Sequence, residues 1–363
     1  MRSFSALRIL LVMAAVLLGT VSMSAQAGLF GGPENPIRED GLSYLGKNNI
    51  KRIVIPSFTV IFHTKANKTA QSKRGLFSGN KSNAKSAMFV EWKDPDMGML
   101  QKIADDAYHS FEGKLTSSGF EVVPMQQVVA SEPYGKINGS TAAVRDEKML
   151  SIAPTGMKVY DPAGKIDPDG SFFLGVANFN SKLEGDVAKA VLGNLDGVAT
   201  ARVTLNLVFG TFEAEANTVV GDYDTASAQV SFVPVLTLAT TTPTVTPMIT
   251  GIELSSNFES AKLPNGTEFN MPRNISRVQL NVPQLGDKSV CSIRDVTTAG
   301  EKTGVGLANV IGMLSALGGG VGGSLEAGNF EASVDSDAFQ SQANVQISKL
   351  ADLIGDKLKS VAQ

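Results

Sequence analysis

Few side chains in this sequence could carry out acid–base or nucleophilic chemistry. The chain has two histidines, His63 and His109, and one cysteine, Cys291. A hydrolytic triad needs a base held beside a nucleophile by a carboxylate, and neither histidine has a G-x-S-x-G segment or a carboxylate at a recognisable spacing. Two histidines and one cysteine are also too few for an ordinary zinc site. We therefore expect no catalytic residue, no metal and no cofactor.

Other chemical motifs fail on spacing. The segment "DPDGS" (167–171) begins like a calcium loop, but counting from Asp167 puts Phe172 at position six and Asn178 at position twelve, where glycine and a carboxylate are required. We expect a turn there. No phosphate-binding G-x-x-x-x-G-K-[ST] segment occurs. A glycosidase-like pair of carboxylates is the one enzymatic arrangement that the sequence leaves open.

One stretch concentrates positive charge. Residues 63–90 contain no acidic residue, and Gly, Ser and Asn fill the gaps between the basic ones. This composition is typical of a mobile loop or a long hairpin. The basic residues either contact an anionic surface, such as a membrane or a wall polymer, or are exposed to solvent without a further role. The candidate contact residues are Lys65, Lys68, Lys73, Arg74, Lys81 and Lys85.

The N-terminus carries the pattern of a secretory signal peptide. Arg2 and Arg8 flank the start of an apolar run over 9–18, and Ala25 and Ala27 form the A-x-A arrangement that signal peptidase recognises. Because that run is shorter than the roughly 20 residues that span a bilayer, we expect cleavage after Ala27 rather than an anchor helix. The predicted location is the periplasm, with outer-membrane association or secretion as alternatives.

Composition and charge fit a globular protein. Cleavage would remove two arginines and no acid, which takes the net charge from −3 to about −5 and gives no reason to expect nucleic-acid binding. Apolar residues make up 43% of the chain. A single cysteine cannot form an intramolecular disulfide, and we expect Cys291 to be a half-buried structural thiol.

The first half of the chain predicts a strand–helix–strand unit. Residues 50–62 have the β-branched and aromatic composition of a buried strand. A helix follows, capped by Asp94 or Asp96 and ended by Gly119, and a second strand occupies 120–124. Such a βαβ unit has parallel strands. The expected core face of the helix is Leu100, Ile103, Ala104, Ala107, Phe111 and Leu115.

The second half predicts strands between two helices. A short helix is expected over 183–193 and alternating strands over 201–215, 227–240 and 276–283. An amphipathic C-terminal helix is expected over 336–361. Its core face would be Ile347, Leu350, Ala351, Ile354, Leu358 and Val361. The fold class is therefore α/β, with α+β as the alternative, built on a mixed sheet.

These elements suggest how the chain is divided into segments. After the signal peptide we expect an N-terminal arm (28–49), a βαβ domain (50–180) with the basic insertion at 63–90, and a strand-rich region (181–363). Residues 125–180 look loop-rich. The uncharged stretch 303–325 is expected to form a short helix (304–317) and a glycine loop (318–324), because its apolar part is too short to span a membrane.

The order of elements resembles a known periplasmic domain. The segments that carry the resemblance are "VIPSF" (54–58), "LTSSGFEVVP" (115–124) and "QSQANVQISKLADLIGDKLK" (340–359). They are similar to the αβ domain shared by the curli secretion channel family, the TolB N-terminal domain and the outer-membrane activators of peptidoglycan synthases. The resemblance implies a helix packed on a sheet and an envelope protein that binds other proteins. Many of those proteins are lipoproteins, and this chain lacks the lipid-attachment cysteine.

The sequence therefore predicts an exported, non-catalytic cell-envelope protein that acts as an assembly, secretion or interaction factor. Its partner would be another envelope protein or a second copy, with an anionic membrane surface or wall polymer as a further contact. The alternatives are an oligomeric outer-membrane channel component of the curli-secretion type and a secreted surface-binding protein.

Overall fold

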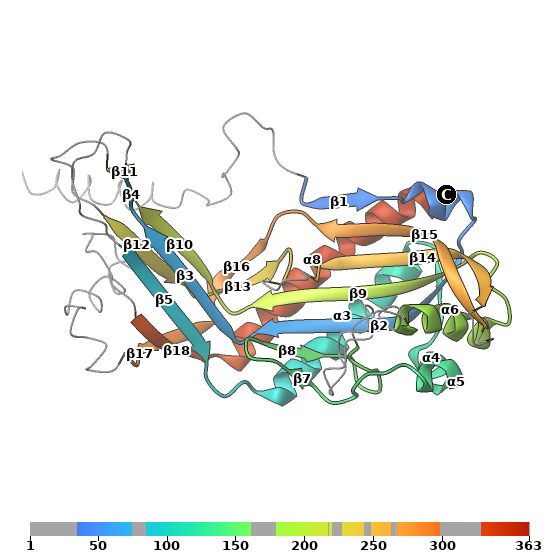
Figure 1. The fold of residues 1–363 in the computed structure, drawn as a ribbon, viewed down its shortest axis with the longest axis horizontal. Helices are drawn as coiled ribbons and strands as arrows, with labels where there is room; N and C mark the ends of the chain where they lie inside the picture. The colour runs from blue at the N-terminus through green and yellow to red at the C-terminus, as the bar shows by residue number, and fades with distance from the viewer. Residues whose placement is uncertain are drawn as a thin grey trace, which may run out of the picture. The chain divides into compact units, whose positions relative to one another are not determined.

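The structure is a computed structural model (Figure 1). It describes residues 35–74, 85–160, 179–216, 218–219, 227–242, 248–262, 266, 268–297 and 328–362. The chain divides into two units, Met1–Pro36 and Ile37–Gln363, and every element named below belongs to the second. The predicted signal peptide, the helix over 304–317 and the glycine loop over 318–324 lie outside the described residues.

A mixed sheet forms the centre of the described fold, which confirms the predicted fold class. Its strands follow the order β1-β15-β14-β9-β2-β8-β7, while β13 joins β9 to β16 and β6 pairs with β2. The central pair, β2 and β9, is parallel, and β14 and β15 continue antiparallel from β9. The strands are β1 (Ile37–Asp40), β2 (Arg52–His63), β6 (Glu121–Val122), β7 (Val144–Arg145), β8 (Met149–Ile152), β9 (Val198–Val208), β13 (Val235–Ala239), β14 (Gly251–Lys262), β15 (Glu268–Leu280) and β16 (Gln284–Ser289).

The predicted βαβ unit is present. Helix α3 (Met97–Ser117) joins β2 to β6, and the two strands are parallel neighbours, with Arg52 opposite Glu121. Asp96, and not Asp94, caps the helix: its Oδ1 accepts hydrogen bonds from the backbone N–H groups of Gly98 and Met99 at 2.9 and 3.1 Å. A carboxylate in this position satisfies N–H groups that have no partner within the helix.

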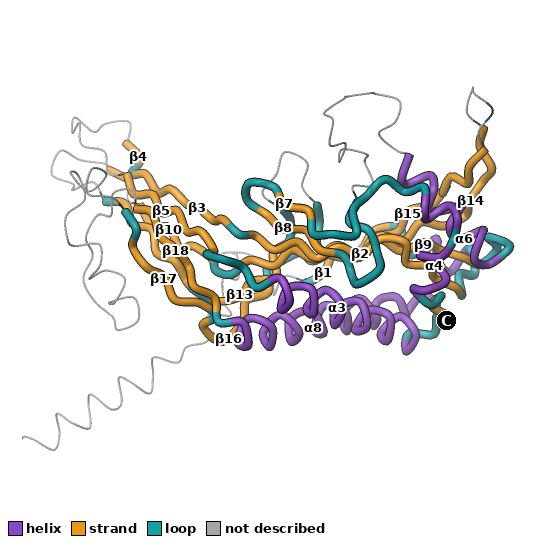
Figure 2. The backbone as a smooth tube through the Cα atoms, turned by 90° about the horizontal axis from the view of Figure 1, so that it is seen from below, coloured by secondary structure: helices purple, strands orange, loops and turns teal. Residues whose placement is uncertain are grey.

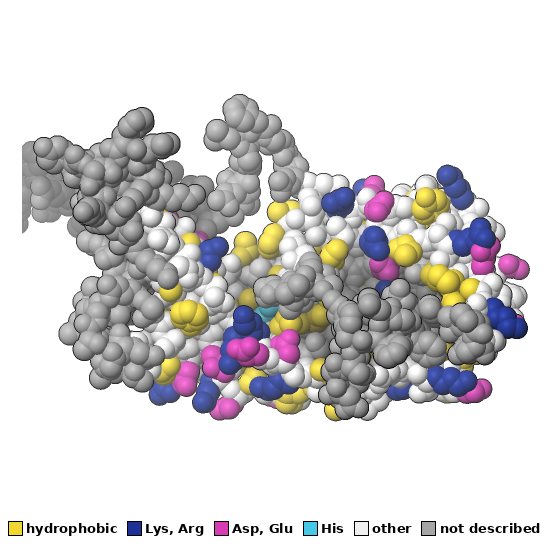
Figure 3. Space-filling model, in the orientation of Figure 1, with side chains coloured by type: hydrophobic (Ala, Val, Ile, Leu, Met, Phe, Trp, Pro, Cys, Tyr) yellow, Lys and Arg dark blue, Asp and Glu magenta, His cyan; other side chains and the backbone are white. Residues whose placement is uncertain are grey.

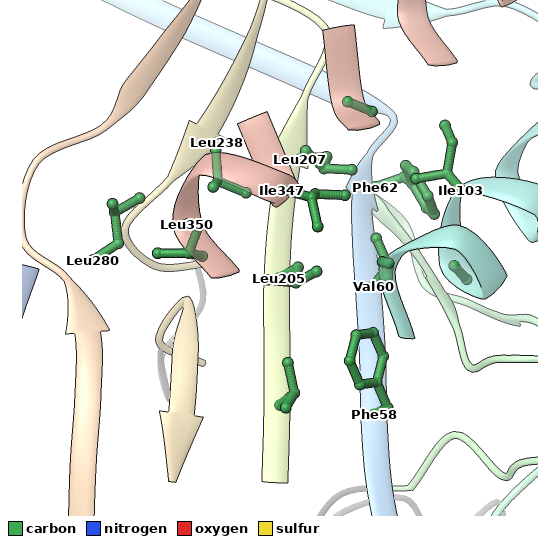
Figure 4. Close-up of a cluster of buried hydrophobic side chains, with 14 of the residues drawn as sticks. Phe58, Val60, Phe62, Ile103, Leu205, Leu207, Leu238, Leu280, Ile347 and Leu350 are labelled. Atoms are coloured by element: carbon green, nitrogen blue, oxygen red, sulfur yellow. The ribbon is translucent and has the colours of Figure 1, made fainter. Parts of the chain in front are cut away.

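Helices α3 and α8 (Ser336–Ala362) lie side by side on one face of the sheet (Figure 2). The alternation of β2 and β9 turns one set of apolar side chains towards them, including Phe58, Phe62 and Leu205 (Figure 4). The predicted core faces of both helices are buried, apart from Val361, which is partly buried. Each large side chain buried here stabilises the fold by roughly 1.5–3 kcal/mol.

The two helices approach closely at the end of α3. The hydroxyl of Ser118 donates to the carbonyl of Gly355 at 2.9 Å, and this bond is buried. A Cβ added to Gly355 would lie 3.0 Å from the same hydroxyl oxygen. The glycine therefore sets how near α8 can come to α3.

A second, smaller core lies on the opposite face of the sheet. Helices α4 (Met125–Ala130), α5 (Glu132–Gly135) and α6 (Phe179–Leu192) supply it together with Val54 and Val198 of the sheet. Helix α6 corresponds to the helix predicted over 183–193. The short helix α2 (Ser43–Lys47) instead contacts β15 and α8.

Further strands form a second group of sheets. A four-stranded sheet has the order β17-β18-β5-β3, and the pairs β10-β12 and β4-β11 accompany it. The rings of Trp92, Phe209, Phe232 and Phe212 form a continuous chain of contacts between them. The strands are β3 (Lys65–Gln71), β4 (Lys73–Arg74), β5 (Lys85–Trp92), β10 (Thr211–Ala216), β11 (Thr218–Val219), β12 (Ala228–Val233), β17 (Cys291–Asp295) and β18 (Gly328–Val334).

Four chain segments pass directly from the central sheet into these sheets. The strands break at Thr64, at Phe209–Gly210, at Pro234 and at Val290, and we call these residues the crease. The predicted strands 201–215 and 227–240 are each divided in two here. At Gly210 an added Cβ would overlap the ring of Phe232, and Pro234 has no N–H with which to continue a ladder.

Several elements differ from the sequence predictions in extent. The basic stretch is a long hairpin in which β3 pairs antiparallel with β5, so the second of its two predicted structures holds for the described residues. Strand β15 begins at Glu268 rather than Ser276, and its partner β14 was not predicted. The described part of the loop-rich stretch contains α4, α5, β7 and β8.

Strand β16 lies at an edge of the central sheet, and side chains of α8 cover that edge. The amide nitrogen Nε2 of Gln346 donates to the carbonyl of Leu285 at 3.1 Å. One turn earlier, Gln342 accepts from the backbone N–H of Asp287 at 3.4 Å and donates to its carboxylate at 2.8 Å. Between them, a Cβ on Gly286 would lie 2.8 Å from Gln342 Oε1. The helix thus takes the place of a neighbouring strand.

Candidate functional site

The predicted basic contact residues are spread over a hairpin. The structure describes five of the six positions: Lys65 and Lys68 on β3, Lys73 and Arg74 on β4, and Lys85 at the start of β5. Lys81 lies outside the described residues. Successive side chains of a strand point to opposite faces, so Lys65 and Lys68, three positions apart, do not share one. Lys65 and Lys68 therefore lie on different faces of β3, and contact of the basic residues with an anionic surface stays a prediction.

Lys65 belongs to a row of charged side chains across the four-stranded sheet, in which two carboxylates lie between two basic residues. It lies opposite Glu91, with 3.4 Å between Nζ and Oε1. Glu91 lies opposite Glu331 of β18, and Glu331 opposite Arg294 of β17. The guanidinium of Arg294 donates to Glu331 at 2.7 Å and is the main cause of the lowered pKa of that carboxyl. This face is consequently mixed in charge rather than basic.

An exposed aromatic side chain lies beside this row. Phe89 of β5 is 45% exposed and shares the outward face of the sheet with Glu91, two positions along the strand. Its neighbours in register are Asn67 of β3 and Asn329 of β18. A large apolar ring rimmed by polar and charged side chains is the arrangement that anchors many protein–protein contacts.

A cluster of buried charge lies on the face of the central sheet that α6 covers. Arg202 of β9 donates to Glu184 of α6 through Nε at 3.1 Å and Nη2 at 2.8 Å, and to Glu253 of β14 through Nη1 at 2.9 Å. Glu253 also accepts from Nε of Arg277 at 2.7 Å, and the Tyr160 hydroxyl donates to Glu184 at 2.9 Å. These side chains link α6 to three neighbouring strands.

The electrostatics of this cluster are typical of a structural ion-pair network rather than of an acid–base centre. Burial opposes the charge of Arg202, but the carboxylates of Glu184 and Glu253 outweigh it and raise the pKa of the guanidinium. Burial and the charge of Glu184 raise the pKa of Tyr160. Glu184 is 2% exposed, and both of its oxygens accept hydrogen bonds within the cluster. Its carboxylate is therefore unsuited to abstract a proton from a bound molecule.

His63 ends β2 at the crease and is buried. Burial lowers its pKa to about 4, against the opposing effects of Asn206 and the Asp146 carboxylate. Its Nε2 has no hydrogen-bond partner in the described structure. The imidazole is therefore neutral at ordinary pH. His109, on α3, is exposed beside Glu112.

Cys291 is a buried free thiol, more buried than the half-buried thiol that the sequence predicted. Burial raises its pKa to about 12, and Sγ donates to the carbonyl of Phe209 at 3.6 Å. Because the thiolate is the nucleophilic form, this cysteine is poorly reactive at neutral pH.

The sequence contained one signal for the buried cluster. Arg202 lies in the alternating stretch 201–215, on the face occupied by Thr204 and Asn206. A charged residue within an otherwise apolar strand suggests a buried partner. Its partners could not be identified, since Glu184 and Glu253 come from other elements and are fixed only by tertiary packing.

Comparisons with protein-family models, curated proteins and solved structures found no match for this chain. No described helix is both long and apolar enough to cross a membrane. Among the described residues, no group of three or more histidine, cysteine or acidic side chains is placed to hold a metal ion.

Proposed function

We propose that this chain is an exported, non-catalytic cell-envelope protein that acts as an assembly, secretion or interaction factor by binding another protein. The observation that carries the proposal is the exposed ring of Phe89, between Asn67 and Asn329 and next to the charge row that begins at Lys65. Burying such a ring in a partner would remove apolar surface from water, while the surrounding charges would select the partner.

The chemistry of the buried groups supports a binding role. Both oxygens of Glu184 accept hydrogen bonds from neighbouring side chains, His63 is neutral, and the Cys291 thiol is protonated. We therefore assign partner binding to the surface around Phe89.

Export to the periplasm is supported by the N-terminal sequence, with its arginines, apolar run and Ala25-x-Ala27 site. The partner is an envelope protein or a second copy of the chain. The channel component and the surface-binding protein stay predictions from the sequence, as does the contact of the basic residues with lipid or wall polymer.

The proposal is tested by crosslinking and pull-down of the tagged protein from the envelope, comparing the native chain with Phe89→Ser. We expect a stoichiometric partner whose recovery falls at least tenfold in the variant. Met271→Ser is the matched control, because Met271 is 43% exposed but lies on β15 of the central sheet. The absence of any stoichiometric partner, or equal recovery with Phe89→Ser, would contradict the proposal.

Export is tested separately by cell fractionation and by the mass of the mature chain. We expect an N-terminus at Gly28 and release by osmotic shock. Retention in outer membranes after an alkaline carbonate wash would instead favour the channel component.

A further inference from the structure

His63 at the end of β2 lies directly opposite Met149 at the start of β8, and residues opposite each other in a ladder share one face of the sheet. The preceding pair, Phe62 and Leu150, belongs to the main core. Because successive side chains alternate, His63 and Met149 point to the face away from α3 and α8. An imidazole and a thioether, both of which bind metals, are therefore neighbours on that face.

The hydrogen bonding of the ladder brings these two side chains close together. The backbone N–H of Thr64, the next residue of the chain, donates to the carbonyl of Lys148 at 2.8 Å. Hydrogen-bonded and non-hydrogen-bonded pairs alternate along antiparallel strands, so His63 and Met149 form a non-hydrogen-bonded pair. In such a pair the Cα atoms are only about 4.5 Å apart, which is the closer of the two spacings in an antiparallel ladder. The two side chains can therefore reach one ion.

Neither side chain has the surroundings that its burial would ordinarily require. The His63 ring is 4% exposed, and its Nε2 has no hydrogen-bond partner among the described residues. Met149 is 5% exposed, yet it belongs to neither of the two apolar cores of the described structure. A buried ring nitrogen without a partner calls for an explanation, and a bound ion is one such explanation.

The electrostatics around the pair favour a cation. Burial lowers the pKa of His63 to about 4, so the imidazole is in the neutral form that coordinates metals at ordinary pH. The side chain of Asn206 opposes this effect on the pKa, as an acceptor beside a ring N–H does. The carboxylate of Asp146 also opposes it, and its Oδ1 accepts from the backbone N–H of Met149 at 2.6 Å. A negative charge is thus fixed next to the methionine.

The ligand types select the metal. A thioether is a soft ligand that suits Cu(I), whereas Mg²⁺, Ca²⁺ and Mn²⁺ prefer carboxylate, carbonyl and water oxygens. We propose that His63 and Met149 bind one Cu(I) ion, or its analogue Ag(I), through Nε2 and the thioether sulfur. The ion would join β2 to β8 beside the crease residue Thr64. This site is separate from the surface around Phe89 and does not depend on the proposed partner binding.

The proposal is tested by anaerobic competition for Cu(I) between the protein and a chromophoric Cu(I) chelator at neutral pH. The protein is the full chain carrying Cys291→Ser, which removes its one thiol. We expect one bound equivalent, and an affinity at least tenfold weaker in both Met149→Leu and His63→Gln. The matched controls are Met157→Leu, at a buried methionine of the main core, and His109→Gln, and both should bind as tightly as the parent chain. Replacing methionine with leucine keeps the side-chain volume, so these variants should fold.

A second measurement needs no substitution at the site. One equivalent of Ag(I) added to the chain with isotope-labelled methionine methyl groups should shift the magnetic resonance signal of Met149 and leave that of Met157 in place. No Cu(I) taken from the chelator, equal affinities of Met149→Leu and Met157→Leu, or an unshifted Met149 signal would each overturn the proposal.

Discussion

The amide nitrogen of Asn206 donates to the hydroxyl oxygen of Thr250 at 2.9 Å, at the point where β9 changes neighbours. Up to Thr204, β9 pairs with β14, and from Asn206 it pairs with β13. Thr250 lies in the gap between those partners, where its hydroxyl accepts from the Asn206 side chain and backbone and donates to the carbonyl of Ala239. One hydroxyl thus connects three strands.

Replacing Thr250 with valine should destabilise the fold by about 2 kcal/mol, because buried donors and an acceptor lose their partner while the shape is kept. Thr250→Ser is the control, since it retains the hydroxyl. The measurement is the free energy of unfolding in urea. Unchanged stability in Thr250→Val, or a larger loss in Thr250→Ser than in Thr250→Val, would contradict this role of the hydroxyl.

Removing Glu184 should leave Arg202 as a buried, partly compensated charge. We expect Glu184→Gln to destabilise the protein by about 3 kcal/mol, the range observed when one partner of a buried ion pair is removed. The double variant Glu184→Leu with Arg202→Met should recover much of that loss. Glu132→Gln, in the exposed pair with Lys136, should have no measurable effect. A double variant less stable than Glu184→Gln would be inconsistent with this account.

His63 should make stability depend on pH. Its pKa is about 4 in the folded chain and about 6.5 when exposed, so the unfolded state binds the proton more readily. The neutral His63 side chain therefore contributes about 3 kcal/mol to the free energy of unfolding above pH 6.5. This contribution is lost as the pH falls towards 4. We expect His63→Gln to flatten this part of the stability profile and His109→Gln to leave it unchanged. The single tryptophan, Trp92, is a convenient probe because its backbone N–H donates to the carbonyl of Thr64, the residue after His63. A profile that stays steep in His63→Gln would assign the effect to carboxylates.

Two helical glycines should respond in opposite ways to alanine. Gly113 of α3 has open space where a Cβ would be, so Gly113→Ala should stabilise the protein by about 0.5–1 kcal/mol. A Cβ on Gly355 of α8 would lie 3.0 Å from Ser118 Oγ, so Gly355→Ala should leave the stability unchanged or lower it. Thermal unfolding of both variants provides the comparison. A similar gain at both sites would mean that α8 can move away from α3 at little cost.

The helices were predictable because their signals are local. Asp96 and the spacing of residues such as Ile103 and Phe111 suffice to define α3, and Ile347, Leu350 and Ile354 define the core face of α8. The division at Pro234 was missed because apolar alternation continues across it, from Phe232 to Leu236. At Gly210 the alternation shifts from Phe209 to Phe212, which was a sign of the break. These strands break because of how Phe232 and the second group of sheets pack, and the sequence of one strand does not reveal that packing.

The candidate surfaces were only partly predictable. The spacing of Lys65 and Lys68 already separates them in a strand, so the choice between loop and hairpin decided whether the basic residues could act together. The exposure of Phe89 could not be predicted from the sequence, because it depends on which face of β5 packs against the core. The partners of Arg202 required knowledge of strand order and of the position of α6.

Helix α8 follows every other described element in the chain, yet it supplies one side of the main core and the glutamines that cover β16. Until its residues leave the ribosome, the part of the apolar sheet face that α8 covers and the edge at Leu285 are exposed. Folding of the described sheet is therefore delayed until α8 has been synthesised, and a nascent chain stopped before Ser336 is a substrate for chaperones and proteases.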